Sequence, residues 1–406
     1  MSIHPAWSAL GFTGLLAGLL AVAPGARADV VTDANERAAR VASTVRVTPI
    51  AVRTMAIVQV SVFDAVQAIS GRHRPLVAQL PAAPGASVEA AVAAATRTAL
   101  LALVPAERAA IEADYQAALG SLPENPAKAE GITVGERAAS AVLAARADDG
   151  AESKVAYRPR TSPGVYVPTA QPLVPHWGRR KPWLMKTGDE VRPAPPPSLE
   201  SDTWRRDLAE VAALGGKQST RRTAEQTAIA RFWETTSPGV YWPIVCNVAA
   251  ARGGDASDCA LLLAEAAVAM DDALIAVFDA KYAFEFWRPV TAIRNAPPDV
   301  RDPGWEPLIE TPMHPEYPCA HCIVAGAVGA VLEAAIGDAP SPRLRSTSPS
   351  AGGAERTWSN PAEFVNEVSE ARIAAGVHYR NSTEVGRAMG RRIAGMVQRR
   401  FAVAKK

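Results

Sequence analysis

A proline-rich stretch in the middle of the chain limits the fold more than any other feature of the sequence. Residues 158–198 contain ten of the 33 prolines, and proline removes a backbone donor and clashes with the preceding helical turn. This stretch therefore cannot form a regular helix. Because it also contains Tyr166, Trp177, Trp183 and Leu184, we predict an ordered loop that crosses between two helical halves and lines the entrance to a site.

On both sides of this loop, apolar residues recur at helical spacing. The predicted helices span residues 33–43, 49–69, 88–103, 106–119, 126–146, 202–214, 223–234, 242–251, 257–287, 318–336 and 361–375, with a last helix from about 381. A high alanine content and an aromatic share of 6% favour helices over a β-sandwich. No strand pattern longer than a few residues appears, and we predict a mobile loop at residues 338–360. The sequence thus predicts one all-α helical-bundle domain over residues 29–406, with an N-terminal half at 29–157 and the functional site in a C-terminal half at 199–406.

The first 28 residues are typical of an export signal. The apolar run from Leu10 to Val22 is too short to cross a bilayer, and the small-residue pattern Ala26-Arg27-Ala28 follows it. We predict cleavage before Asp29 and a soluble mature protein that is periplasmic or secreted, with no later membrane-spanning segment. The alternative is an uncleaved membrane anchor, because the leading region lacks Lys and Arg.

Composition excludes one broad class of partner and leaves the cysteines open. The net charge is +2, without the concentration of Lys and Arg that nucleic-acid binding requires. Four cysteines allow three pairings, and the sequence does not choose between these and free thiols: Cys246, Cys259, Cys319 and Cys322.

Two cations stand seven residues apart in Lys281-Tyr-Ala-Phe-Glu-Phe-Trp-Arg288-Pro289. In a helix, a spacing of seven brings two side chains to nearly the same face. Pro289 places Arg288 at the C-terminal end of the predicted helix. We therefore expect Lys281 and Arg288 to reach one bound anion.

Two later segments complete a candidate oxyanion site. With Pro318 as the first helical residue, the amide groups of Cys319 and Ala320 would lie free at a helix N-terminus, where an anion is stabilised. One residue further, His321 can exchange a proton.

The second of these segments runs from Arg372 to His378. Its arginine adds a third cation, and its imidazole can exchange a proton or bind a central atom. Gly376 permits the sharp turn that would bring His378 back towards Arg372.

In order and internal spacing, these segments resemble the signature of vanadium-dependent haloperoxidases and type-2 phosphatidic acid phosphatases. That signature reads Lys, six residues, Arg-Pro; then Pro-Ser-Gly-His; then Ser-Arg, five residues, His, three residues, Asp. The matching residues are Lys281, Arg288, Pro289, Pro318, His321, Arg372 and His378. The resemblance covers residues 281–382 and implies the helical-bundle fold of that superfamily.

The resemblance also implies a cofactor and a role for each matching residue. Vanadate would be the cofactor, and phosphate would compete for the same site. Its equatorial oxygens would be bound by Lys281, Arg288, Arg372 and the backbone amide of Ala320. His378 would bind vanadium, or would be the nucleophile in a phosphatase, and His321 would be the acid or base. Hydrogen peroxide, a halide and a small organic acceptor would be the substrates, and a homo-oligomer is compatible with the sequence.

Several positions depart from the signature. Cys319 and Ala320 stand for its Ser and Gly, and Ser382 stands for its closing Asp. Loss of that carboxylate should harm a nucleophilic histidine more than a vanadate ligand, which favours the haloperoxidase. His314 occupies a position where bromide-using relatives carry His and chloride-using relatives Phe, so bromide or iodide is expected.

Three alternatives to a haloperoxidase remain open at this point. One is a histidine phosphatase of the same superfamily, and another is a non-catalytic oxyanion-binding protein. The third treats Cys319-Ala-His-Cys322 as a redox or metal-binding pair.

Overall fold

The computed structural model of the chain describes Met1 and residues 30–402. The predicted export signal, apart from Met1, and its cleavage site before Asp29 lie outside the described residues. Their assignment therefore stays a prediction.

The described residues form thirteen α-helices and one two-stranded sheet, which confirms the all-α prediction. The N-terminal helices are α1 (Val30–Ala42), α2 (Thr48–Ser70), α3 (Val88–Leu103), α4 (Arg108–Gly120) and α5 (Pro126–Ala145). The C-terminal helices are α6 (Asp202–Gly215), α7 (Ala224–Phe232), α8 (Pro238–Arg252), α9 (Ala256–Phe284), α10 (Pro289–Arg294), α11 (Ala320–Ile336), α12 (Pro361–Ala374) and α13 (Arg380–Ala402). Short 3₁₀ turns are η1 (Pro105–Glu107), η2 (Trp177–Arg179), η3 (Gly188–Val191) and η4 (Pro349–Ala351).

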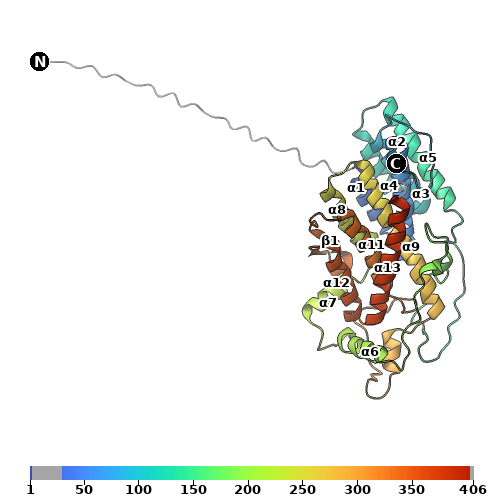
Figure 1. Cartoon of the computed structure of the whole chain (residues 1–406), viewed down its shortest axis with the longest axis vertical. Helices are drawn as coiled ribbons and strands as arrows, with labels where there is room; N and C mark the ends of the chain where they lie inside the picture. Colours follow the sequence, from blue (N-terminus) through green and yellow to red (C-terminus); the bar gives the residue numbers. More distant parts are fainter. Residues whose placement is uncertain (2–29, 403–406) are drawn as a thin grey trace.

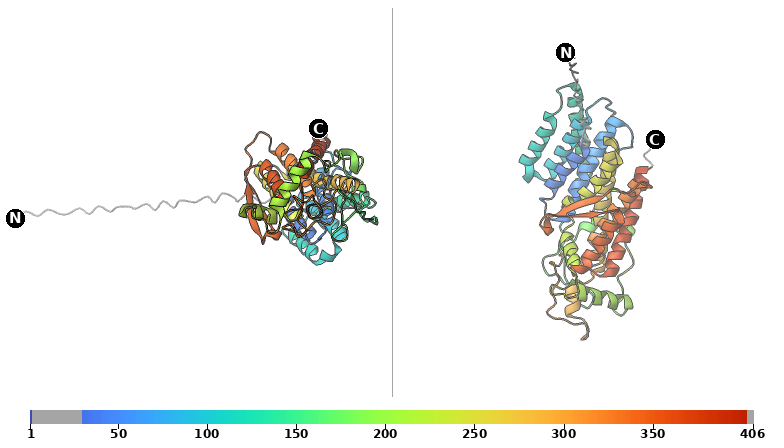
Figure 2. Two further views of the ribbon diagram at one scale, coloured as in Figure 1. Left: turned by 90° about the horizontal axis from the view of Figure 1, so that it is seen from below. Right: turned by 90° about the vertical axis from the view of Figure 1, so that its left-hand side faces the viewer.

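Helix α9 is the central element of the bundle. Its residues are apolar on almost every side and nearly all are buried, which is the pattern of a helix surrounded by others. It packs against α2 from the N-terminal half and against α11 and α13 from the C-terminal half. Figure 1 shows α2 to α5 gathered at one end of the long axis and α6 at the other. The right-hand view of Figure 2 shows the same arrangement from another side, and the left-hand view looks along the long axis. The largest apolar cluster contains residues from both halves.

Among the described residues, helix α2 is long and apolar enough to cross a membrane by length and composition alone. Helix α3 and the helical segment after it, which are bent relative to each other, would also qualify if they were counted as one span. Helix α2 contains Arg53 and Asp64, so this finding does not contradict the sequence-based expectation that no later stretch without charges is long and apolar enough to cross a membrane. Inside the fold, 89% of the most apolar window of α2 is buried.

Glycines on α13 allow it to lie very close to α11. A Cβ on Gly386 would stand 2.7 Å from the carbonyl oxygen of Cys319, and one on Gly390 would stand 2.2 Å from that of Ile323. Only a residue without a Cβ fits at such a distance. This contact fixes the start of α11 against the first turns of α13, which follow His378.

The proline-rich segment is an ordered loop, as predicted. Two neighbouring carboxylates on α9 hold it: Asp272 accepts the amide groups of Trp183 and Leu184 at 2.7 and 3.0 Å, and Asp271 accepts the indole N–H of Trp183 at 2.8 Å. Arg180 reaches the same Asp271 at 2.8 Å. The loop is therefore fixed to the most buried helix of the molecule.

The prediction of a mobile loop at residues 338–360 is wrong. Strands β1 (Leu344–Ser348) and β2 (Ala354–Trp358) pair antiparallel there. The buried side chains of Leu344, Ser346 and Ser348 alternate with exposed ones. Ser346 and Ser348 donate to the carbonyl oxygens of Val240 and Phe232, each within 2.7 Å. Polar residues that pack through such hydrogen bonds give no apolar strand signal in the sequence.

Candidate functional site

Lys281 lies in the last turn of α9 and is fully buried. Its ammonium group donates to the carbonyl oxygens of Pro315 and Glu316 at 2.8 and 2.7 Å. Both acceptors belong to the loop before α11. The cation therefore joins the end of the central helix to the segment that carries the second motif.

Arg288 also contacts the loop before α11, but its backbone position differs from the predicted one. Helix α9 ends at Phe284, because Glu285 adopts the left-handed conformation with φ 49°, and Arg288 is the N-cap of α10. The helical spacing argument for Lys281 and Arg288 is thus wrong, although both side chains converge. Arg288 donates to the carbonyl oxygens of His314 and Val377 at 2.9 and 2.8 Å, so it joins the second and third motifs.

Arg372 lies near the end of α12, and Gly376 turns the chain after it. Gly376 has φ 80°, a conformation that favours glycine, and it brings His378 back towards the arginines as predicted. One guanidinium nitrogen of Arg372 donates to the carbonyl oxygen of Trp233 at 2.6 Å. Its Nε and Nη2 are buried without a hydrogen-bond partner, an arrangement that costs free energy unless a ligand accepts from them.

His378 is held between a carboxylate and a cation. Its Nδ1 lies 2.6 Å from Oε1 of Glu316, and its Nε2 lies 3.3 Å from Nη1 of Arg288. The carboxylate accepts the proton of Nδ1, so the lone pair of Nε2 faces Arg288. Both His378 and Glu316 are almost completely buried.

The start of α11 differs by two residues from the prediction. The helix begins at Ala320 with Cys319 as N-cap, so Pro318 is not its first residue. The amide of Cys319 is not free, since it donates to the carbonyl oxygen of Ser382 at 3.2 Å. The thiol of Cys319 accepts the amide of Cys322 at 3.3 Å. The amide groups of Ala320 and His321, which precede the first intrahelical bond, are the ones open to a ligand.

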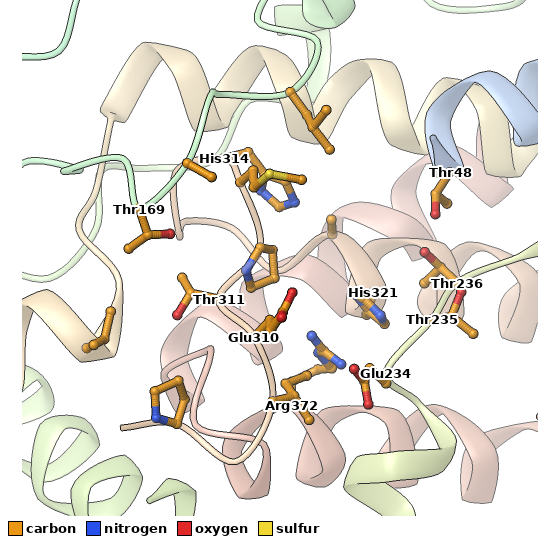
Figure 3. A pocket seen from close by; sticks show the side chains of 18 of the residues that line it. Thr48, Thr169, Glu234, Thr235, Thr236, Glu310, Thr311, His314, His321 and Arg372 are labelled. Atoms are coloured by element: carbon orange, nitrogen blue, oxygen red, sulfur yellow. The ribbon is translucent and has the colours of Figure 1, made fainter. Parts of the chain in front are cut away.

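A cavity of about 950 Å³ opens above this helix start. Ala320, His321, Arg372 and His314 line it, together with residues 169–170 and 173–174 of the proline-rich loop, which therefore borders a cavity as predicted. Figure 3 shows Arg372, His321 and Glu234 close together on one side and His314 on another. The residues Lys281, Arg288, Cys319 and His378 lie behind this lining and do not form part of it.

Burial and like charges dominate the electrostatics of the site. Burial lowers the pKa of Arg288 to about 10 and lowers that of Lys281 and Arg372 as well. The pKa values of His314, His321 and His378 lie well below their ordinary range, first because the rings are buried and then because the cations are near. The imidazoles are therefore neutral.

Two carboxyl groups act on these three cations. Burial raises the pKa of Glu316 to about 7, and Lys281 and Arg288 act against that rise, while the charge of Glu234 raises the pKa of Arg372. Two carboxyl groups, one of them with a pKa near 7, leave an excess of positive charge among three cations, so a bound anion would be favoured.

The donor set fits a tetrahedral or trigonal oxyanion such as vanadate. Two N–H groups of Arg372 and Nε2 of His321 are buried without a partner, and all three belong to residues that line the cavity beside the amide of Ala320. Within the described residues, no group of three or more His, Cys, Asp or Glu could hold a bare metal ion. The chemistry of the site is that of anion binding.

Sequence reasoning missed two acidic residues. Glu316 gives no periodic signal, and only its place in Pro315-Glu316-Tyr317-Pro318, directly before the second motif, could have drawn attention to it. Glu234 follows α7, lines the cavity and raises the pKa of Arg372 through its charge. Glu234 and the third motif are more than 130 residues apart in the sequence, so the sequence alone gives no sign of this interaction.

All four cysteines are buried. Cys319 and Cys322 are neighbouring thiols at the start of α11, and no disulfide joins them.

Comparison with known proteins supports the resemblance seen in the sequence. A family model described as the VCPO second helical-bundle domain matches residues 261–404. A solved structure described as the first bacterial vanadium-dependent iodoperoxidase is 25% identical, with a TM-score of 0.78, over 91% of this chain and 95% of that one. These similarities support the vanadium haloperoxidase superfamily for this chain.

Two further similar proteins match less of the chain or share less of its sequence. The vanadium chloroperoxidase of Curvularia inaequalis is 32% identical over 205 residues, which are 42% of this chain and 34% of that protein. The chain thus spans about a third of the length of this curated relative. An apo-type bacterial vanadium-dependent chloroperoxidase shares 17% identity and a TM-score of 0.72, covering 87% and 94% of the two chains, and this likeness shows the shared fold.

Proposed function

We propose that this protein is a vanadate-dependent haloperoxidase that oxidises iodide or bromide with hydrogen peroxide. The observation that carries the proposal is a set of buried polar atoms without partners that belong to the lining of a cavity next to a helix start: the Nε and Nη2 donors of Arg372 and the Nε2 of His321. Support also comes from the similarity to a bacterial iodoperoxidase over nearly the whole of both chains.

The residues of the site divide into three roles in this proposal. Arg372 and the amide of Ala320 would hold oxygens of vanadate on the cavity side, and Lys281 and Arg288 would supply positive charge from behind. His378 would bind vanadium through Nε2. When bound, vanadate supplies Lewis acidity that makes peroxide oxygen reactive towards a halide.

His321 is the group that would move a proton. Its ring is neutral because burial lowers its pKa, and its Nε2 has no partner. A neutral imidazole can take a proton from peroxide and return it to a departing oxygen. We propose that it does so at Nε2.

His314 is the residue that we propose to influence the choice of halide. Its ring lies 5.1 Å from that of Phe278 and its Nδ1 lies 3.0 Å from Nη2 of Arg288, at the wall of the cavity. The His314→Phe variant should oxidise chloride better relative to iodide than the natural protein does. An unchanged ratio of kcat/KM values for the two halides would show that His314 has no such role.

The proposal is tested by loading the purified protein with vanadate and measuring triiodide formation and dye bromination with hydrogen peroxide. Protein loaded with phosphate should be inactive. The His321→Ala variant should lose most of the activity, whereas His176→Ala should retain it, since His176 does not line the cavity and bonds to the carbonyl oxygen of Ala151. Vanadate-loaded protein that binds the anion but oxidises no halide would refute a haloperoxidase.

A phosphatase is the second candidate, and one contact favours it. Because Glu316 orients His378, the absence of a carboxylate at Ser382 no longer argues against a nucleophilic histidine. Hydrolysis of an aryl phosphate by vanadate-free protein, inhibited by added vanadate, would identify a phosphatase. Activity in neither assay would indicate a non-catalytic oxyanion-binding protein. The proposed periplasmic or secreted location is tested by fractionating cells that express the full chain.

A further inference from the structure

The carboxylate that should follow the third motif is absent from this chain, yet His378 has a carboxylate partner. Ser382 occupies the position of the closing Asp, and its side chain is buried in the first turn of α13. The partner of His378 comes instead from the loop before α11, where Oε1 of Glu316 lies 2.6 Å from Nδ1 of the ring. Two segments 62 residues apart in sequence thus meet at one imidazole.

Backbone contacts on both sides hold Glu316 in this position. Its own amide donates to the carbonyl oxygen of Phe286 at 2.9 Å. Its Oε1 also accepts the amide of Tyr379 at 3.2 Å. The carboxylate is therefore aimed at the ring by the loop that carries it and by the chain that follows His378.

The positions of Glu316 and Ser382 lie next to each other around the ring. Ser382 follows His378 by four residues, and its side chain is among the groups that lower the pKa of the Glu316 carboxyl. The carbonyl oxygen of Ser382 accepts the amide of Cys319, which stands three residues after Glu316. A carboxylate at either position could reach the same ring.

We propose that Glu316 is the positioning residue of His378 and replaces the carboxylate that the chain lacks at Ser382. The effect of Glu316 on vanadate binding rests on the proposed function, whereas its contact with His378 does not. Glu316 fixes the proton on Nδ1 and leaves the lone pair of Nε2 for the bound anion. Partners of this kind orient a ligand without touching the bound group, and their loss commonly lowers affinity 10- to 100-fold.

The experiment has one readout that needs no vanadate. Side-chain ¹⁵N resonances of His378, assigned by their absence in a His378→Gln variant, report which ring nitrogen carries the proton. The natural protein should show the proton on Nδ1. Glu316→Ala should mix or invert the two tautomers, and the double variant Glu316→Ala/Ser382→Asp should restore the proton to Nδ1.

The second readout is vanadate affinity, measured by equilibrium dialysis. Glu316→Gln, which keeps the shape of the side chain, and Glu316→Ala should each bind vanadate roughly 10- to 100-fold more weakly. The double variant should recover at least half of that loss on a logarithmic scale. A purely structural role for Glu316 would not be rescued by a carboxylate placed on another segment.

A matched control is Asp64→Asn, which alters another fully buried carboxylate that accepts backbone amide groups. This variant should leave the tautomer of His378 and the affinity for vanadate unchanged. An unchanged tautomer in both Glu316 variants would overturn the proposal, as would a double variant that folds but regains neither readout. If the natural protein binds no vanadate but the tautomer follows the carboxylate, the proposed function fails and the positioning role stands.

Discussion

Replacing Arg372 by methionine should stabilise the anion-free protein and weaken anion binding at the same time. Arg372 is fully buried, and two of its three guanidinium nitrogens have no partner. Methionine is similar in length and keeps the apolar contacts of the side chain. The substitution therefore removes the buried charge and its unmade hydrogen bonds without opening a large space.

The expected gain in stability follows from the contacts. Each unpaired buried donor costs about 1–3 kcal/mol, so removing two should recover about 4 kcal/mol. The carbonyl oxygen of Trp233 loses its donor at 2.6 Å, which costs about 2 kcal/mol. The free energy of unfolding of Arg372→Met without anion should thus exceed that of the natural protein by about 2 kcal/mol.

The expected loss of anion affinity has the same origin. Two charge-assisted hydrogen bonds of about 1.5–3 kcal/mol each would disappear. A loss of at least about 3 kcal/mol corresponds to more than a 100-fold weaker Kd. At a vanadate concentration about 100 times the Kd of the natural protein, that protein should gain about 2.7 kcal/mol and the variant about 0.4 kcal/mol or less.

Urea unfolding with and without vanadate measures both effects. Arg180→Met is the matched control, because Arg180 is equally buried but is paired with Asp149 and Asp271 at 2.7 and 2.8 Å. Breaking those pairs should cost about 3–5 kcal/mol and leave the stabilisation by vanadate intact. An anion-free Arg372→Met protein that is less stable than the natural one, or one that vanadate stabilises fully, would refute the reasoning.

Three further predictions concern the fold. Burial raises the pKa of Asp272 to about 7, whereas the same carboxyl releases its proton near pH 4 in the unfolded chain. The protonated carboxyl therefore contributes fully to stability below about pH 4. This contribution, up to about 4 kcal/mol, is lost as the pH rises through about 7. Unfolding of Asp272→Asn followed against pH should lack that fall. Gly376→Ala should lower Tm and cost about 2 kcal/mol or more, because its Cβ would lie 2.3 Å from the carbonyl oxygen of Gly215; Gly352→Ala, with φ 65° but nothing within 4 Å, should cost less. Thiol titration of the unfolded protein should count two thiols fewer in a Cys319→Ala/Cys322→Ala variant than in the natural protein, whereas an unchanged count would reveal a disulfide between these two cysteines.

Helix positions were predictable because the apolar residues repeat with the helical period along most of the chain. The failures lie where another interaction decides the backbone. Helix α9 stops three residues before the predicted end, because Glu285 turns into the left-handed region, for which glutamate gives no sequence signal. The β-hairpin was invisible because its buried face contains serines that bond to the carbonyl oxygens of other segments.

The members of the site were predictable only as three separate segments. Spacing and residue type identified the cations and the two histidines, but nothing local indicates that Glu316 reaches His378 or that Trp233 supplies a carbonyl oxygen to Arg372. Both contacts join residues distant in sequence. They depend on how the helices pack, which a single sequence does not specify at this level.

The floor and the rim of the cavity are built from different parts of the chain. The groups held at the floor are therefore separate from the residues that control entry at the rim. The floor consists of helix ends whose charges are fixed by many mutual contacts, whereas part of the rim is the proline-rich loop, clamped to the central helix by two adjacent carboxylates. Residues 169–174 of that loop can therefore change without moving the floor. Substitutions in this rim alone could change which molecules enter the cavity, while the cations and imidazoles of the floor keep their positions.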